Sequence, residues 1–342
     1  MRNEAATKFE GVKIDSMQAL RGIAAIFVAC QHVTWLYRGG FGVEFFFIIS
    51  GFVAMYSTQS STKHFLAKKI IRIVPLYYLV TAANTILILL VPSMFMDSTV
   101  TLETVIKSFL FIPYEQGNSI ITFIMPIVRV GWTLNYEIMF YLIFFLAIKI
   151  SQKYRGIIAA GILTALSVVG FIFPKLPQPW HFWTEQYLTE FAIGIILFYV
   201  FKFIYENVAR NVVAAILSLV AAAGLFAFLW WGCAQQSILE LPRLIAYGIP
   251  ATLIVVLFFY AGCCIKTPKF LVAFGNITYP FYLIHYYPLT FVSRKVWYGE
   301  RPTFLQVLIT LAALAVSIGL AYLVHILIEV KFTGFLKKKL LK

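Results

Sequence analysis

The chain has 342 residues, of which 61% are hydrophobic and 12% are charged, and its formal net charge at pH 7 is +14. This composition excludes an ordinary soluble domain, in which about 45–50% of the residues are apolar. The net charge alone could suggest nucleic acid binding, but the cationic residues collect on one side of the predicted spans. The sequence therefore predicts an integral membrane protein without a nucleic acid partner.

Ten apolar segments are each long enough to cross a bilayer as a helix, whereas barrel strands would be about ten residues long and alternating. The predicted fold is an all-α integral membrane protein, a single domain over residues 1–342 with one bundle of about ten transmembrane helices. The expected spans are 19–36, 41–58, 70–91, 132–149, 156–173, 188–204, 210–231, 243–263, 272–292 and 304–329.

The distribution of Lys and Arg predicts the orientation of these spans. With a cytoplasmic N-terminus, 20 of the 28 Lys and Arg residues fall on the cytoplasmic side or at cytoplasmic helix ends. The opposite orientation would invert this bias. Both termini are then cytoplasmic, and the basic tail over residues 331–342 is expected to lie against anionic membrane lipid.

The first predicted span contains two ionisable residues, Arg21 and His32. They are eleven positions apart, so they return to one face of a helix, about 16 Å apart along its axis. An ionisable side chain in hydrocarbon costs several kcal/mol and by default lines a protein interior or a polar pathway. The pair predicts a reaction centre reached through the membrane, with Arg21 near the cytoplasmic end and His32 in the outer half.

A cluster of cations is predicted at the cytoplasmic end of the third span, where Lys68, Lys69 and Arg72 lie at the level of Arg21. An Arg fork beside Lys point charges suits a phosphorylated ligand that enters from the cytoplasm. For Lys68 and Lys69, extension of the side chain towards the lipid headgroups is an equally weighted alternative. Arg72, inside the apolar segment KKIIRIVPLYY, favours the ligand site.

The connection over residues 92–131 is far longer than a helix bundle needs, and it is expected on the outer face. Its apolar middle, TLETVIKSFLFIPYE, is too short to cross the bilayer and predicts an interfacial or re-entrant helix. Long loops in compact proteins often form lids or binding surfaces, so this one is assigned to the side that receives the substrate. A loose surface loop is the alternative.

Four titratable side chains are predicted at similar depth in the outer half of the membrane: His32, Glu44, Glu137 and His285. Any one of them alone could form a structural hydrogen bond, but their convergence points to chemistry. Burial can keep an imidazole neutral, and a neighbouring carboxylate can fix its tautomer. Glu137 is the preferred partner of His32, and Glu44 is its competitor because a short connection makes the first two spans neighbours.

Other familiar site patterns are missing from the sequence. There is no GxSxG elbow, HExxH motif or phosphate-binding glycine loop, so serine-hydrolase and metal chemistry are disfavoured and no metal is expected. The four cysteines lie in or at the ends of spans and predict no disulfide framework.

Seven segments stand out in chain order: ALRGIAAIFVACQH, GVEFFFIISGF, KKIIRIVPLYY, FIPYE with VGWTLNYEIMFY, FAIGIILFY, FGNITYPFYLIHYYPL, and Glu329 before a basic tail. In this order they resemble the signature of the acyltransferase-3 family of membrane O-acyltransferases. The resemblance runs from about Ile14 to Lys339. The fourth span and the loop before it look most like family members that decorate exopolysaccharides.

This resemblance implies transfer of an acyl group from cytoplasmic acyl-CoA, usually acetyl-CoA, to a hydroxyl of an extracytoplasmic carbohydrate or lipid-linked glycan. It implies a multi-pass protein of the bacterial inner membrane that modifies the cell surface, and it leaves the oligomeric state open, a homodimer included. The family's Arg and His signature residues correspond to Arg21 and His32. Its basic cluster, whose first member is commonly Arg, corresponds to Lys68, Lys69 and Arg72. A fused soluble hydrolase-like domain, which the family often carries, is not expected here.

Together the residues and the resemblance give a mechanistic hypothesis. The CoA phosphates bind the basic cluster, and His32, oriented by Glu137, acts as general base on the acceptor hydroxyl. A covalent acyl-histidine intermediate is the alternative route. The acceptor and oxyanion site is expected among Glu44, Asn276, Tyr279, Tyr282 and His285.

Two other classes of function are compatible with the composition. A transporter or flippase for a glycolipid or small solute would use His32 and Glu137 as a proton relay, although no inverted repeat is visible. A structural scaffold for polysaccharide assembly would leave the intramembrane charges unexplained. Turnover of a CoA thioester separates the enzyme from both.

Overall fold

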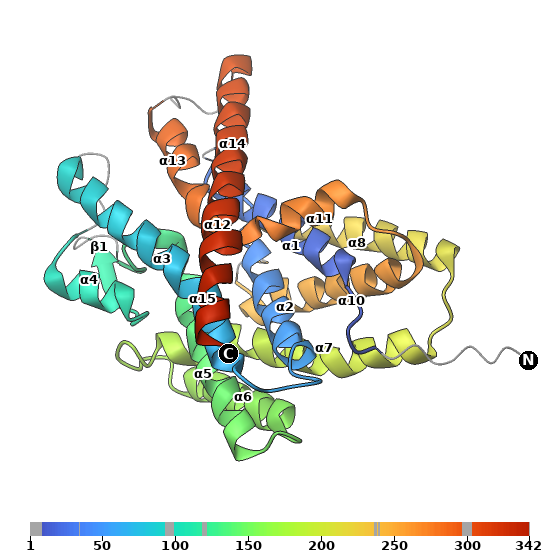
Figure 1. The fold of residues 1–342 in the computed structure, drawn as a ribbon. Coiled ribbons are helices and arrows are strands. Elements are labelled where there is room, and N and C mark those ends of the chain that lie inside the picture. Colours follow the sequence, from blue (N-terminus) through green and yellow to red (C-terminus); the bar gives the residue numbers. More distant parts are fainter. Residues whose placement is uncertain are drawn as a thin grey trace, which may run out of the picture.

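The computed structural model describes residues 9–33, 35–92, 99–117, 122–235, 238, 240–295 and 303–341, and these residues are almost entirely helical (Figure 1). The strands within these ranges, β1 (Glu115–Gly117) and β2 (Thr122–Ile124), form one antiparallel pair with Gln116 opposite Phe123. The predicted all-α class is confirmed.

The longer helices form the body of the molecule, and short helices and turns connect them. The longer ones are α1 (Asp15–Gln31), α2 (Gly42–Tyr56), α3 (Phe65–Leu90), α5 (Trp132–Ile150), α6 (Arg155–Ile172), α7 (Tyr187–Asn207), α8 (Val212–Gly232), α10 (Ile249–Cys264) and α14 (Phe304–Val324). The shorter ones are α4 (Leu102–Phe109), α11 (Lys269–Asn276), α12 (Thr278–Ile284), α13 (Tyr286–Lys295) and α15 (Thr333–Leu340). Tighter or wider turns form η2 (Arg129–Gly131), η3 (Phe182–Thr184), η4 (Leu244–Gly248) and η5 (His325–Phe332).

Seven helical stretches in the described part of the chain are long and apolar enough to cross a membrane. They are Phe65–Leu90, Arg129–Ile150, Arg155–Ile172, Phe182–Asn207, Val212–Gly232, Leu244–Cys264 and Phe304–Leu340, and each coincides with one of the ten predicted spans. Two further predicted spans form the shorter helices α1 and α2, of 17 and 15 residues. Seven of the ten expected spans are thus found at full length.

The predicted span over residues 272–292 is three short helices instead of one. Helix α11 ends at Asn276 and helix α12 ends at Ile284. Pro280 and Pro288 lie four residues after these two ends, and a proline has no N–H with which to bond the carbonyl four residues before it. The sequence thus supplies the cause of each break, and His285 lies at the second one.

Helices α2 and α7 pack closely because glycines face each other across their contact. A Cβ built on Gly51 would lie 2.1 Å from the Phe191 carbonyl oxygen, and one on Gly194 would lie 2.0 Å from that of Ile48. Any larger residue at either position would push the backbones apart.

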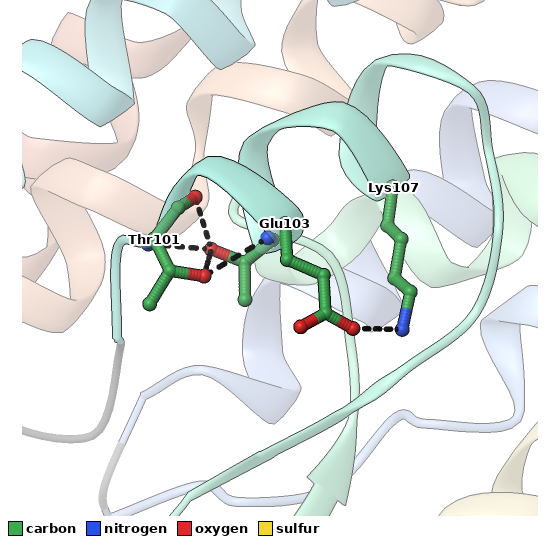
Figure 2. A network of polar contacts seen from close by, with 4 residues as sticks. Thr101, Glu103 and Lys107 are labelled. Carbon is green, nitrogen blue, oxygen red and sulfur yellow. Dashed lines mark hydrogen bonds and ion pairs between the residues drawn. The ribbon is translucent and has the colours of Figure 1, made fainter.

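The long connection contains the expected short helix. Helix α4 begins with a capping box in which the Thr101 hydroxyl accepts the backbone N–H of Thr104, and Figure 2 shows this network together with the Glu103–Lys107 ion pair one turn later. The ammonium of Lys107 lowers the pKa of the exposed Glu103 carboxyl. Both features stabilise a short helix in a polar setting.

Hydrogen bonds attach the described part of this connection to α3. The Tyr77 hydroxyl donates to the Ser108 carbonyl at 3.1 Å, and the Asn84 side-chain amide donates to the Ile127 carbonyl at 2.7 Å. All four residues are buried. Residues 99–117 and 122–131 are therefore a packed part of the fold, which excludes the loose-loop alternative for them.

The C-terminal helical stretch is longer than predicted. Helix α14, the π-helical turn η5 and helix α15 continue into one another from Phe304 to Leu340, and Figure 1 draws this stretch running crosswise to α7 and α8. The predicted basic tail over residues 331–342 is therefore helical up to Leu340.

Candidate active site

Three cavities follow one another through the bundle, and each shares wall residues with the next. The first, here called the Arg cavity, has a volume of about 240 Å³, and its lining includes Gln18, Arg21, Arg72, Asn276, Tyr279 and Glu329. The middle cavity, of about 40 Å³, is lined in part by Arg21, Ser50, Thr133, Glu137, Tyr279 and Tyr282. The third, the His cavity, of about 930 Å³, is lined in part by Gln31, His32, Arg129, Arg243, Tyr282 and Tyr286.

Residues shared between neighbouring walls show that the three cavities are adjacent. Arg21 and Tyr279 line both the Arg cavity and the middle cavity, and Tyr282 lines both the middle cavity and the His cavity. Arg21 in α1 and His32 at its C-terminal end therefore lie at two points of one series of cavities. The helical spacing predicted a shared face for these two residues, and the structure turns that face towards the cavities.

The Arg cavity combines cations from both ends of the chain. Arg21 and Arg72 come from α1 and α3, and Lys337 comes from α15. Glu329 adds one carboxylate, whose Oε2 lies 2.6 Å from the Nδ1 atom of His325, another residue of this wall. The sequence did not predict a contribution from Lys337 or His325, because their meeting with Arg21 depends on how the C-terminal helix packs.

Two predicted members of this cation cluster do not line the Arg cavity. Lys69 is buried with its Nζ atom 4.8 Å from the centre of the Tyr141 ring, and its charge interacts with those of Arg72 and Arg21. Lys68 is exposed and does not line the Arg cavity. Lys68 and Lys69 point about 100° apart with Arg72 between them, so helical spacing alone does not decide which of the three line the cavity. Arg21 and Arg72 line it, Lys69 lies close to both without lining it, and the exposed Lys68 stays outside it.

Glu137, the predicted partner of His32, lies in the wall of the middle cavity and not next to His32. Glu137 accepts hydrogen bonds from the Ser50 hydroxyl at 3.0 Å and from the Tyr141 hydroxyl, and it shares the cavity wall with Arg21. The predicted pairing of Glu137 with His32 is therefore wrong. The Ser50 bond joins α2 to α5, as expected for a hydroxyl between packed membrane helices.

In the His cavity, His32 lies against a second imidazole. The ring centres of His32 and His285 are 5.4 Å apart, and the edge of Tyr286 approaches His32 at 5.0 Å between ring centres. The Ser293 hydroxyl donates to the His32 backbone carbonyl at 3.3 Å. Among the four titratable residues predicted to converge, only these two histidines meet.

Glu44, the other predicted competitor for His32, is fully buried and binds an arginine instead. Its Oε1 atom lies 2.6 Å from Nε of Arg243, and Nη2 of Arg243 donates to the Gly40 carbonyl at 3.3 Å. The Arg243 guanidinium also lies over the Tyr187 ring, 5.0 Å from its centre. This ion pair attaches the start of α2 to η4, and Arg243, which sequence reasoning missed, lines the His cavity while Glu44 lies behind the wall.

The remaining candidates for an oxyanion donor are already engaged or distant. The Tyr279 hydroxyl donates to the Ile73 carbonyl at 2.7 Å, and the Tyr282 hydroxyl donates to the Val130 carbonyl at 3.0 Å. Asn276 lines the Arg cavity, not the His cavity. Of the residues expected at the acceptor site, His285 lies next to His32 and Tyr282 lines the His cavity.

The comparison with family models identifies the architecture that carries these cavities. The model of the Acyl_transf_3 family, described as an acyltransferase domain, matches residues 14–326. The chain belongs to this family. The match includes Arg21, His32, Arg72, Glu137 and His285 of this acyltransferase, whereas Glu329 and Lys337 lie beyond it.

Two curated relatives resemble the acyltransferase over long stretches. The "Exopolysaccharide production protein ExoZ" of Rhizobium meliloti (strain 1021) is 29% identical over 262 residues, which cover 75% of this chain and 78% of the relative. The "Putative acetyltransferase ORF330" of Acidianus two-tailed virus is 27% identical over 197 residues, or 54% of this chain and 57% of the relative. No solved structure matches the acyltransferase.

Proposed function

We propose that this protein is an acyl-CoA-dependent O-acyltransferase. The acyl group, with acetyl as the expected one, moves from CoA bound at the Arg cavity to a hydroxyl of a carbohydrate or lipid-linked glycan in the His cavity. Family membership supports acyl transfer, and the name of the Rhizobium relative, which refers to exopolysaccharide production, supports a glycan acceptor.

The observation that carries the proposal is the series of three adjacent cavities that lies between Arg21 and His32. A donor with a charged head and a reactive end on a long thin arm needs a cation site, a narrow passage and a reaction chamber, in that order. The three cavities have this order.

The charges of the Arg cavity suit the phosphates of CoA. Arg21 and Arg72 provide planar guanidinium groups, which bind phosphate oxygens in pairs, and Lys337 adds a mobile point charge. Glu329 opposes an anion here, so its contact with His325 has a proposed role: the imidazole holds the carboxylate away from the phosphates.

In the proposed reaction, His32 is the general base. It removes the proton of the acceptor hydroxyl as the hydroxyl oxygen attacks the thioester carbonyl, and the C–S bond then breaks. The CoA thiolate leaves and takes the proton from the imidazolium, so the products are an O-acyl ester and free CoA thiol. Proton transfer of this kind contributes about 10²–10⁴-fold to a rate.

The middle cavity sets a condition on this mechanism. Its volume of about 40 Å³ is close to that of one water molecule, which is too small for the pantetheine arm. The proposal therefore requires the side chains of Tyr279 and Tyr282 to move when the donor binds. Glu137 lines the same cavity as these tyrosines. In this mechanism its charge attracts Arg21, and it does not orient His32.

The proposed placement is a bacterial inner membrane with both termini in the cytoplasm. Ten spans result if α1 crosses once, α2 crosses once, and the short helices α11–α13 together form one crossing, in addition to the seven longer stretches. The Arg cavity then opens to the cytoplasm, where acyl-CoA is found, and the connection over residues 92–131 borders the acceptor side. The chain 1–342 works as one domain in contact with membrane lipid.

Transfer by the purified protein tests the proposal. The protein in lipid nanodiscs receives acetyl-CoA labelled in the acetyl group, with and without an oligosaccharide acceptor, and both released CoA thiol and labelled glycan are measured. Stoichiometric thiol release with acceptor labelling is the expected result. A protein that binds acetyl-CoA but never releases thiol, or that moves a glycolipid across liposomes without a thioester, would contradict it and favour the transport alternative.

A further inference from the structure

The side chain of His32 lies next to a second imidazole, that of His285. His285 is fully buried at the break between α12 and α13, with its ring stacked on Phe281 at 5.3 Å between ring centres. Pro288 leaves the Ile284 carbonyl without its helical N–H partner, and His285 at this break keeps helical backbone angles.

Hydrogen bonding determines which nitrogen of His285 carries the proton. Its Nδ1 atom lies 3.0 Å from the Phe281 carbonyl oxygen. A carbonyl oxygen only accepts, so Nδ1 must donate, and in a neutral ring Nε2 is then an unprotonated acceptor. This Nε2 atom is buried without a hydrogen-bond partner in the described part of the chain. His285 therefore presents an unused acceptor inside the protein.

His32 is the titratable group that can use this acceptor. The two ring centres are 5.4 Å apart, and no direct hydrogen bond joins the rings in the described structure. A small rotation of the His32 ring or one bridging water completes the contact. The carboxylates that could compete are engaged elsewhere: Glu44 with Arg243, and Glu137 with Ser50 and Tyr141. An imidazole thus stands where other base catalysts have an Asp or Glu.

We propose that His285 is a positioning residue that fixes the tautomer and ring orientation of His32. Nε2 of His285 accepts the N–H of one His32 nitrogen, directly after a small rotation of the His32 ring or through one water, so the other nitrogen of His32 carries the lone pair and faces the His cavity. This inference rests on the proposed function, since it assigns how the general base of that reaction is prepared.

The assignment also decides the fate of the transferred proton. The proton of the acceptor hydroxyl joins the free nitrogen of His32, and the resulting imidazolium keeps its other N–H bonded to His285 until the thiolate takes one proton back. His285 does not donate to the oxyanion, because its single N–H is committed to Phe281.

Two amide variants of His285 separate positioning from a merely structural role. The terminal amide of Gln reaches the place of Nε2, whereas the shorter amide of Asn reaches the place of Nδ1. His285→Gln keeps an acceptor for His32, and His285→Asn keeps only the bond to Phe281. We expect His285→Asn to lower kcat about 10²-fold and His285→Gln to stay within a few-fold of wild type, with KM for acetyl-CoA unchanged in both.

The opposite ranking, with His285→Asn active and His285→Gln inactive, would overturn the proposal in favour of a structural bond to Phe281. So would equal loss in both variants when acetyl-CoA binding and size-exclusion profile are unchanged.

A measurement on the unmutated protein keeps the proposal testable if both variants fail to fold. In ¹⁵N-histidine-labelled protein, nitrogen chemical shifts and couplings report each tautomer, and we expect His285 to be Nδ1-protonated and His32 to be a single tautomer coupled to it. A mixture of His32 tautomers would overturn the inference. This result is independent of turnover. Absence of acyl transfer in the wild type would therefore contradict the proposed function but not the tautomer assignment.

Discussion

The two ends of the cavity series differ in size and in chemistry. The Arg cavity has about 240 Å³ and contains charged groups from α1, α3 and the C-terminal helices, whereas the His cavity has about 930 Å³ and a wall with many aromatic side chains beside Arg129 and Arg243. A small charged site suits one ligand of constant chemistry, such as a phosphate group. A large aromatic one suits a bulky acceptor whose sugar rings pack on aromatic faces. The difference supports the proposal that the donor and the acceptor bind at opposite ends.

The largest expected effect on acyl transfer is that of a substitution in the His cavity. His32→Ala should lower acyl transfer by about 10²–10⁴-fold while acetyl-CoA still binds, because the general base is lost and the Arg cavity is untouched. Thiol release and calorimetric titration measure the two quantities. His181→Ala is the matched control, since His181 is far along the chain and pairs with Glu185. Normal transfer by His32→Ala would remove His32 from the reaction.

The next effect concerns the stability of the wall of the His cavity. Arg243→Met should destabilise the protein by about 3–5 kcal/mol, because it leaves the fully buried Glu44 carboxylate without its cation. Thermal unfolding in detergent measures the loss. A double variant that also carries Glu44→Gln should recover much of it, and a double variant no more stable than Arg243→Met would show that the ion pair does not hold α2 to η4.

At the donor end, Arg21→Ala should weaken acetyl-CoA binding by about 10–100-fold, the usual value of a hydrogen bond between charged groups. Lys68→Ala should leave affinity unchanged, since Lys68 is exposed and does not line the Arg cavity. Equilibrium titration with a CoA thioester gives both values. Equal losses in the two variants would restore the four-cation site predicted from sequence.

The smallest expected effect lies at the rim of the Arg cavity. Lys337→Ala should weaken acetyl-CoA binding only a few-fold, because an exposed ammonium is screened by water and salt. Lys339→Ala, two residues further along α15 and not part of the cavity wall, should have no effect. The same titration at two salt concentrations checks this, since the Lys337 contribution should shrink at the higher one.

Sequence reasoning succeeded where the deciding property is local. The eleven-residue spacing placed Arg21 and His32 on one helix face, and the two lie along one series of cavities. It failed where the packing of several helices decides which side chains meet. Lys69 and Arg72 are three residues apart, yet only Arg72 reaches the cavity, and Glu137 bonds to Ser50 because α5 packs against α2. Pro280 and Pro288 signalled the breaks in the segment 272–292, although the apolar run predicted one span.

The sequence by itself determined the membrane class, most of the helices, the shared face of Arg21 and His32, and the family. These follow from hydropathy and from the helical period, which act over a few neighbouring residues. Only the tertiary structure decided the partners: Lys337 beside Arg72, and His285 beside His32. Such contacts depend on how helices far apart in the chain rotate and approach each other. Close contacts such as Gly51 against Phe191 fix that rotation and approach.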